Sequence, residues 1–195
     1  ILKNLALPLG VNWEIIGSAK EIKNSFQSLL VVLLIGVFLV YMVMVIQFER
    51  FSHPLIILSS IPFMLIGATL GIIIGKTTLS IVSFLGLITL AGTVVNNAIV
   101  LIDFIELNRK QYGKSLRDAI VNAGSSRLRP ILMTTLTTVL GVLPMALGIG
   151  EGSNLYRPLG LVIAAGLTTS TLITLVLVPV IYYSFEKRKE GKYGK

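Results

Sequence analysis

Two adjacent amides, Asn96 and Asn97, stand inside a long apolar run where polar side chains are uncommon. The run from Thr77 to Ile102 carries no charged residue. It is long enough to cross a bilayer as a helix, because spanning takes about 20 residues at about 1.5 Å each. An amide in hydrocarbon needs a hydrogen-bond partner, which other helices or a hydrated path supply. We therefore interpret the pair as part of a working interface between helices.

Further polar residues share the helix face of Asn96 when about 100° of rotation is allowed per residue. The resulting stripe consists of Thr89, Thr93, Asn96 and Asp103, flanked by Gly86 and Gly92. Asn97 lies one step round the helix and is expected in a neighbouring contact. A polar stripe facing lipid would be costly, so we favour a functional interface, with plain helix packing as the alternative.

Two titratable residues are not expected to carry protons or bind ligands. Asp103 is the only acid inside an apolar run and lies in its last turn before a hydrophilic loop. A membrane-buried proton carrier would lie nearer the midplane, so we expect an ion pair with a loop arginine instead. The single histidine, His53, precedes Pro54 in a short loop and is interpreted as an interfacial residue, not a ligand.

A later apolar run opens with Arg127 and with Pro130 at a first helical position, where the missing N–H costs little. Small and hydroxyl residues follow it at i, i+4 and i+7: Thr134, Thr138 and Gly141. The last apolar run carries a second hydroxyl group: Thr168, Thr169, Ser170, Thr171 and Thr174. These hydroxyls either form a hydrated seam with the asparagine stripe or bond to carbonyls of their own helices. Both alternatives remain open.

Three glycines recur every fourth residue in another apolar run: Gly67, Gly71 and Gly75. Small residues at this spacing let two helices approach closely in lipid, where association rests on packing. The spacing predicts a crowded, protein-facing side of this helix.

The composition fixes the class of protein. The chain is 54% hydrophobic and 13% charged, with a mean hydropathy of +0.86, whereas a soluble domain carries about 25% charged residues. We expect an all-α polytopic membrane protein. Five transmembrane helices are predicted, at about 25–47, 54–75, 79–104, 130–149 and 158–184.

The connection 105–129 is longer than the others and has helical features of its own. Ser115 and Asp118 resemble a helix-opening capping box. Apolar residues recur at helical spacing after it: Leu116, Ala119, Ile120 and Ala123. The pattern predicts a separate amphipathic helix, about 114–124, lying on the cytoplasmic membrane surface.

Lysine and arginine set the expected orientation. Twelve of them fall on the side of the C-terminus and five on the other side, which favours a cytoplasmic C-terminus by the positive-inside rule. Residues 1–24 are then the end of an extracytoplasmic region with a lead-in helix near 18–24, and 185–195 form a basic cytoplasmic tail. The basic residues cluster beside apolar runs, which indicates contact with anionic lipids and no nucleic-acid partner.

Nothing in the sequence is typical of an enzyme. Cysteine is absent, which excludes disulfides, thiolate metal sites and cysteine nucleophiles within this chain. The five methionines are scattered over different helices and are interpreted as gap-filling residues. Walker, GxSxG and metal-ligand motifs are absent, so we expect no metal and no cofactor.

Three motifs in order resemble the resistance–nodulation–division (RND) transporters, and more narrowly their hydrophobe/amphiphile, acriflavine-resistance branch. They are the segments 92–100, 127–135 and 141–152, which read GTVVNNAIV, RLRPILMTT and GVLPMALGIGEG. The resemblance covers nearly the whole chain. It implies that the chain is the C-terminal membrane portion of a larger pump, holding the last five helices of a two-halved bundle.

The resemblance also implies an activity and partners. Such pumps exchange protons inward for substrates outward across the inner or plasma membrane, as secondary active transporters. The implied partners are the N-terminal half of the same pump, further copies in a homotrimer, and a periplasmic adaptor. Residues 1–24 would be the end of the porter region, so we expect this chain to be a piece of a longer protein.

We assign the proton-coupling interface to six residues: Thr93, Asn96, Asn97, Arg127, Thr134 and Thr138. The resemblance implies four of them, whereas Thr93 and Thr138 are added because they share the helix faces of Asn96 and Thr134. Asn97, Arg127 and Thr134 match the asparagine, relay arginine and threonine of the family. Asn96 departs from it, because well-known members carry there a lysine that pairs with two aspartates of the other half. An amide can still hydrogen-bond those acids, so coupling through them remains open. The alternative is a non-transporting scaffold or anchor for an extracytoplasmic domain.

Overall fold

The structure is a computed structural model that describes residues 18–193, with side chains from 20 to 188. The described residues form helices and short connections: α1 (Ser18–Phe48), α2 (Ser52–Leu58), α3 (Ile61–Ile74), α4 (Ile81–Lys110), α5 (Leu116–Leu147) and α6 (Ser153–Tyr193). Five segments are long and apolar enough to cross a membrane: α1, α2 with α3, α4, α5 and α6. The all-α class and the predicted number of five spans are confirmed. The expectations for residues 1–17, and for the side chains of the basic tail beyond 188, lie outside the described residues.

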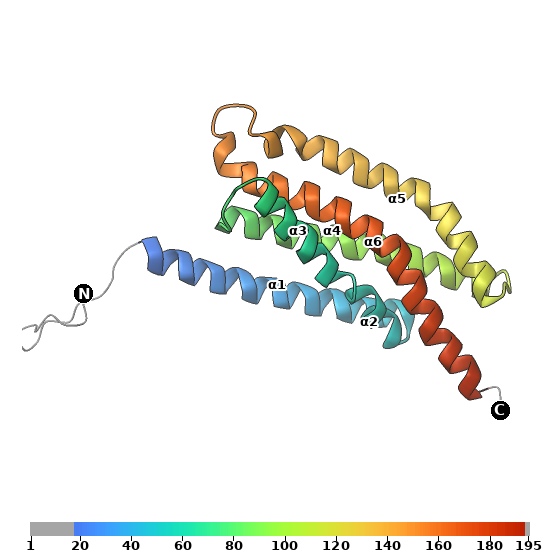
Figure 1. Ribbon diagram of the computed structural model, residues 1–195. Coiled ribbons are helices and arrows are strands. Elements are labelled where there is room, and N and C mark those ends of the chain that lie inside the picture. Colours follow the sequence, from blue (N-terminus) through green and yellow to red (C-terminus); the bar gives the residue numbers. More distant parts are fainter. Residues whose placement is uncertain (1–17, 194–195) are drawn as a thin grey trace, which may run out of the picture.

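The helices form a bundle around α6, which packs against α3, α4 and α5 (Figure 1). α1 lies along one edge of the bundle and α5 along the opposite edge (Figure 1). α1 contacts chiefly α4 and α2, and most of its apolar side chains remain exposed. For a helix of this hydropathy, exposure is compatible with a lipid environment or with a further protein partner.

Contacts at the two ends of the bundle show that successive spans run antiparallel, as predicted. At one end the rings of Phe26 and Phe84, near the starts of α1 and α4, lie 5.8 Å apart. At the same end Arg157, near the start of α6, donates from Nε to the Ala146 carbonyl at 3.4 Å. At the other end the Tyr182 hydroxyl of α6 reaches Glu106, near the end of α4.

The predicted second span, 54–75, is divided into α2 and α3. The break falls at Ser59 and Ser60, whose hydroxyls donate to the carbonyls of Ile56 (2.5 Å) and Ile57 (2.7 Å). Pro62 follows in the first turn of α3, and it has no N–H to continue the α2 hydrogen-bond ladder. The two pieces together still have the length of one span.

The predicted surface helix at 114–124 is wrong as a separate element, because α5 runs without a break from Leu116 to Leu147 with Pro130 inside it. Its predicted start is right, since the Ser115 side chain accepts from the Asp118 N–H at 3.2 Å. The apolar face of this first part is buried in the bundle: Leu116, Ala119 and Ala123 belong to the same core cluster as Ile105. This apolar face therefore contacts protein.

The other helices are longer than the predicted spans. α1 includes the predicted lead-in helix, since no glycine or proline interrupts it before Gly36. α4 continues past Asp103 to Lys110, and α6 continues into the basic tail. α4 begins with reciprocal caps, in which the Ser80 N–H donates to Ser83 Oγ (2.7 Å) and the Ser83 N–H to Ser80 Oγ (3.2 Å). Helix length fixes how far the polar residues near each end lie from the apolar core.

Close approach of α3 and α6 depends on glycine. A Cβ added at Gly67 would lie 2.6 Å from the Thr169 Cβ, and one at Gly71 would lie 2.7 Å from the Leu161 carbonyl oxygen. A Cβ at Gly75 would meet the Leu161 side chain. Because backbone atoms cannot move aside as a flexible side chain does, the two helices can touch at Gly71 only without a side chain there.

We expect Gly71→Ala to lower the apparent melting temperature of the full-length protein in detergent, because the methyl group forces α3 away from α6. The cost is about 1–3 kcal/mol, typical of overpacking. The matched control is Gly36→Ala, at a helical glycine of α1 with no atom within 4 Å of the added Cβ. Equal melting temperatures for the two variants would show that α3 and α6 do not touch at Gly71.

Candidate functional site

The polar stripe predicted on α4 lies on one side of the helix and faces out of this chain. Thr89, Asn96 and Asp103 are exposed and Thr93 is partly exposed. The threonine hydroxyls donate to their own helix, Thr89 to the Leu85 carbonyl (3.0 Å) and Thr93 to the Thr89 carbonyl (3.1 Å). The Asn96 amide is therefore the group of this stripe, at the middle of α4, that is best placed to bond outside its own helix.

Asn97 lies about 100° round α4 from Asn96 and faces α6. It is 9% exposed, and it lines a small cavity with hydroxyl residues of α6. The sequence predicted that Asn97 belongs to a neighbouring contact, and its position agrees with that interpretation. The two adjacent amides thus serve different surfaces, one outside this chain and one inside it.

The hydroxyl residues of α5 are divided in the same way. Thr134 is exposed and Thr138 is partly exposed, and both donate to their own helix, to the carbonyls of Pro130 and Thr134 at 2.9 Å each. The bond to α6 is made by the next residue, Thr135, whose hydroxyl lies 3.1 Å from that of Thr171. One hydroxyl pair thus joins α5 to α6, through Thr135, which lies about 100° round the helix from Thr134.

Arg127 lies near the start of the apolar part of α5, with its guanidinium over an aromatic ring. Its Cζ is 4.3 Å from the centroid of the Phe104 ring, a cation–π geometry. Its Nε is buried and has no hydrogen-bond partner among the described residues. Asp103 forms no ion pair within the described part of the chain, so the expected pairing with a loop arginine is not seen here.

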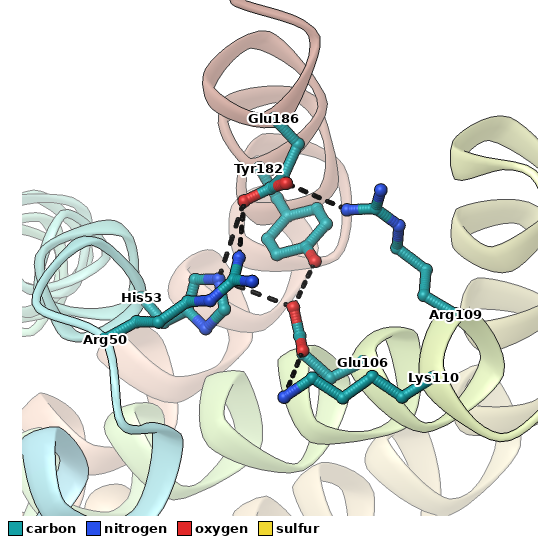
Figure 2. A network of polar contacts seen from close by, with 7 residues as sticks. All are labelled: Arg50, His53, Glu106, Arg109, Lys110, Tyr182 and Glu186. Carbon is teal, nitrogen blue, oxygen red and sulfur yellow. Dashed lines mark hydrogen bonds and ion pairs between the residues drawn. The ribbon is translucent and has the colours of Figure 1, made fainter. Parts of the chain in front are cut away.

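A buried polar network at the opposite end from Phe26 was missed by the sequence analysis (Figure 2). It joins the α1–α2 connection, α2, α4 and α6. Its members are Arg50, His53, Glu106, Arg109, Lys110, Tyr182 and Glu186. His53 is 1% exposed and Tyr182 is fully buried, so the interpretation of His53 as an interfacial residue is wrong. The ring of His53 packs between aromatic neighbours, 5.6 Å from Phe48 and 5.5 Å from Tyr182 between centroids.

Glu106 forms one half of the network. Its Oε1 accepts from the Tyr182 hydroxyl at 2.7 Å and lies 3.5 Å from His53 Nε2. Its Oε2 lies 3.0 Å from the Lys110 ammonium, one turn further along α4. The carboxylate thus meets a donor on α6, a histidine on α2 and a cation on its own helix.

Glu186 forms the other half. Its Oε2 accepts from Arg109 Nη1 at 2.9 Å, and its Oε1 accepts from Arg50 Nη1 at 3.3 Å. His53 Nε2 lies 3.9 Å from the same Oε1, so the histidine stands between the two carboxylates (Figure 2). Two anions are balanced by three fixed cations, which permits both carboxylates to be buried.

The sequence indicates parts of this network through pairs of polar residues at helical spacing. Tyr182 and Glu186 are four residues apart, as are Glu106 and Lys110, so each pair shares one helix face. Periodicity alone could not show that the two faces meet. Chemically the network can hold α2, α4 and α6 together at one end. The described residues contain no group of three or more histidine, cysteine, aspartate or glutamate side chains with metal-binding geometry.

We expect Glu106→Ala to lower the stability of the full-length protein by about 1–3 kcal/mol, because the buried Tyr182 hydroxyl loses its acceptor. Lys110→Ala should cost less than about 1 kcal/mol, because the lysine side chain is 63% exposed. Asp103→Ala, at an exposed acid of the same helix, is the control. Thermal unfolding in detergent checks the order, and a Glu106 variant as stable as the Asp103 variant would contradict it.

Comparison with known proteins agrees with the helical arrangement. The sequence model of the AcrB/AcrD/AcrF family matches residues 1–186. Among solved structures, crystal form II of a heavy metal efflux pump aligns with a TM-score of 0.78 and 31% identity over 92% of this chain. Crystal form I of a heavy metal efflux pump aligns with a TM-score of 0.74 and 33% identity over 91% of this chain. This chain spans 18% of the length of each of those chains.

The match extends over nearly the whole sequence, and the solved structures share its bundle of helices. This chain therefore belongs to the AcrB/AcrD/AcrF family and is a membrane portion of an RND transporter.

Proposed function

We propose that this chain is the C-terminal transmembrane half of a proton-driven efflux pump. The observation that carries the proposal is the outward-facing stripe of α4. Thr89, Asn96 and Asp103 are exposed on a helix that is long and apolar enough to cross a membrane. Polar groups at that depth need partners in protein or in a hydrated path. The described helices leave these side chains exposed, with Asn96 at a groove between α1 and α4. We therefore infer that the partner comes from elsewhere in the pump, and the N-terminal half is the candidate.

Asn96 is the residue that we propose to face the coupling acids. An amide can donate a hydrogen bond to an ionised carboxylate and can accept one from a protonated carboxyl group. The contact therefore persists in both protonation states but changes its donor. Thr93, Thr134 and Thr138 add partly or fully exposed hydroxyls on α4 and α5. Arg127 adds a partly exposed cation beside the Phe104 ring. With Asn97 behind them, these residues form the proposed amide, hydroxyl and guanidinium side of the interface.

For the cargo we propose hydrophobic or amphipathic compounds, following the motif resemblance around Asn96. Metal ions are the second candidate, because both neighbouring structures are of heavy metal efflux pumps. In either case the work of this portion is the same, since it supplies coupling and not cargo selection.

We further propose that the pump is a homotrimer in the inner or plasma membrane and works with a periplasmic adaptor. The start of α1 is then extracytoplasmic and the α4–α5 connection is cytoplasmic. In this orientation the buried ionic network lies at the cytoplasmic end, where exposed Lys110 and Arg117 and partly exposed Lys114 can meet anionic lipid head groups.

We expect Asn96→Leu in the full-length pump to reduce proton-coupled efflux by about tenfold or more while leaving expression intact. Leucine is close to asparagine in size but cannot hydrogen-bond, and an unsatisfied partner costs about 1–3 kcal/mol, which is roughly tenfold per 1.4 kcal/mol. Asn96→Lys should keep more activity, because an ammonium can also pair with an acid. Dye efflux and intracellular pH measured in pump-deficient cells give both readouts.

The matched control is Thr69→Leu, at an exposed residue of α3 whose hydroxyl is used by its own helix, donating to the Leu65 carbonyl at 2.8 Å.

Wild-type cells should be protected against amphipathic dyes and detergents. Protection against divalent metal salts alone would assign the metal cargo instead. Full efflux by Asn96→Leu would make the stripe a packing surface, and absence of any cargo-dependent proton flux in the wild type would leave the scaffold alternative.

The proposed orientation has a direct test. Lys23→Cys and Ser115→Cys, each introduced into a cysteine-free full-length pump, should react with a membrane-impermeant maleimide from opposite sides of the membrane. Three spans separate the two positions, and both side chains are exposed. Lys23→Cys is expected to react from outside in intact cells, and Ser115→Cys only after the membrane is opened. Labelling of both in intact cells would contradict the topology.

A further inference from the structure

A small cavity lies between α4, α5 and α6 near the middle of α4. Its volume is about 10 Å³. The polar residues that line it are Asn97, Ser170, Thr171 and Thr174, and the remaining lining is apolar. The cavity is lined by Asn97 and not by Asn96, so it is separate from the exposed stripe of α4.

Two of these polar side chains have atoms without a hydrogen-bond partner among the described residues. They are Asn97 Nδ2 on α4 and Thr174 Oγ1 on α6, and the two residues are 9% and 4% exposed. The other two hydroxyls are already used: Ser170 donates to the Leu167 carbonyl at 3.2 Å, and Thr171 pairs with Thr135 at 3.1 Å. Buried polar atoms are nearly always paired with protein or with ordered water. Here two unpaired atoms from two helices line one cavity.

We propose that this cavity binds one water molecule, which hydrogen-bonds to Asn97 and Thr174 and so joins α4 to α6. A buried water needs about 10–15 Å³ and two to four polar partners, and the cavity meets both conditions for a single molecule. Water both donates and accepts, so it satisfies the Asn97 amide in either orientation of its oxygen and nitrogen.

The size and charge of the cavity exclude other occupants. A space of about 10 Å³ admits no organic ligand, since such sites measure about 300–1,000 Å³. Charged residues are absent from the lining, and a cation without a countercharge is costly to hold away from bulk water. A neutral molecule of one heavy atom fits both restrictions.

The bound water has a structural consequence for α4. It adds a contact between α4 and α6 beside the direct α5–α6 bond between Thr135 and Thr171. Polar contacts then join all three helices at this level. Asn96 follows about 100° round the helix from Asn97. Holding Asn97 against α6 therefore fixes the rotation of α4 and keeps Asn96 on the exposed side. This role of the water is independent of the cargo and of the coupling ion.

Radiolytic footprinting of the full-length pump in detergent tests the site. Hydroxyl radicals formed from a bound water oxidise the side chains that touch it, even when bulk solvent cannot reach them. Leu101 lines the cavity and is 1% exposed, whereas Leu90 of the same helix is fully buried in an apolar cluster. We expect Leu101 to be oxidised several-fold faster than Leu90. Equal rates in the wild-type protein would overturn the proposal, and they would also be the result for a bound cation.

Variants locate the water at Thr174. Thr174→Val keeps the shape of the side chain but removes the hydroxyl, so oxidation of Leu101 should fall to the rate of Leu90. Thr168→Val is the matched control, because the Thr168 side chain is exposed and donates to the Ala164 carbonyl of its own helix at 2.7 Å; it should leave Leu101 oxidation unchanged. Persistent fast oxidation in a folded Thr174→Val protein would contradict the site, and if that variant does not fold, the wild-type comparison decides alone.

Discussion

A hydrocarbon interior offers no hydrogen-bond partner, and the polar groups of this chain are arranged around that constraint. The backbone meets it by forming helices. Exposed threonines such as Thr89 and Thr134 meet it by donating to carbonyls of their own helices. The carboxylates of Glu106 and Glu186 meet it at one end of the bundle, where cations of α4 and of the α1–α2 connection surround them. Polar atoms that remain unpaired among the described residues are then informative, because each requires a partner.

α6 takes part in most of the contacts that join the helices. It accepts the close approach of α3 at the glycines, it pairs Thr171 with Thr135 of α5, and it brings Tyr182 and Glu186 to α4. Packing against glycine near one end and ionic contacts at the other hold the same helix at two levels. A bundle held in this way behaves as one body. Movement is then expected between this body and protein outside it, which is where the exposed side of α4 lies.

The adjacent amides illustrate how one helix serves both purposes. Asn97 faces α6 and belongs to the interior of this body, whereas Asn96 faces outward. If the facing surface holds acids, as we propose, the amide at position 96 has no net charge to balance them. Hydrogen bonding is what remains, and its strength at membrane depth depends on the exclusion of water from the facing surface.

The sequence by itself determined the class, the number of spans, the small-residue face of α3 and the separation of Asn96 from Asn97, because hydropathy and a 3.6-residue period are local properties. It did not determine that Ser59 and Ser60 would divide one span, or that 116–147 would form one helix through Pro130. Those outcomes depend on packing against neighbours, which can stabilise a helix across a proline or end one at a serine pair. The pairing of Thr135 with Thr171 and the burial of His53 between Glu106 and Glu186 were decided only by the tertiary structure. Their partners are 36 to 133 residues apart, and no periodicity within one helix can show which faces of distant helices will meet.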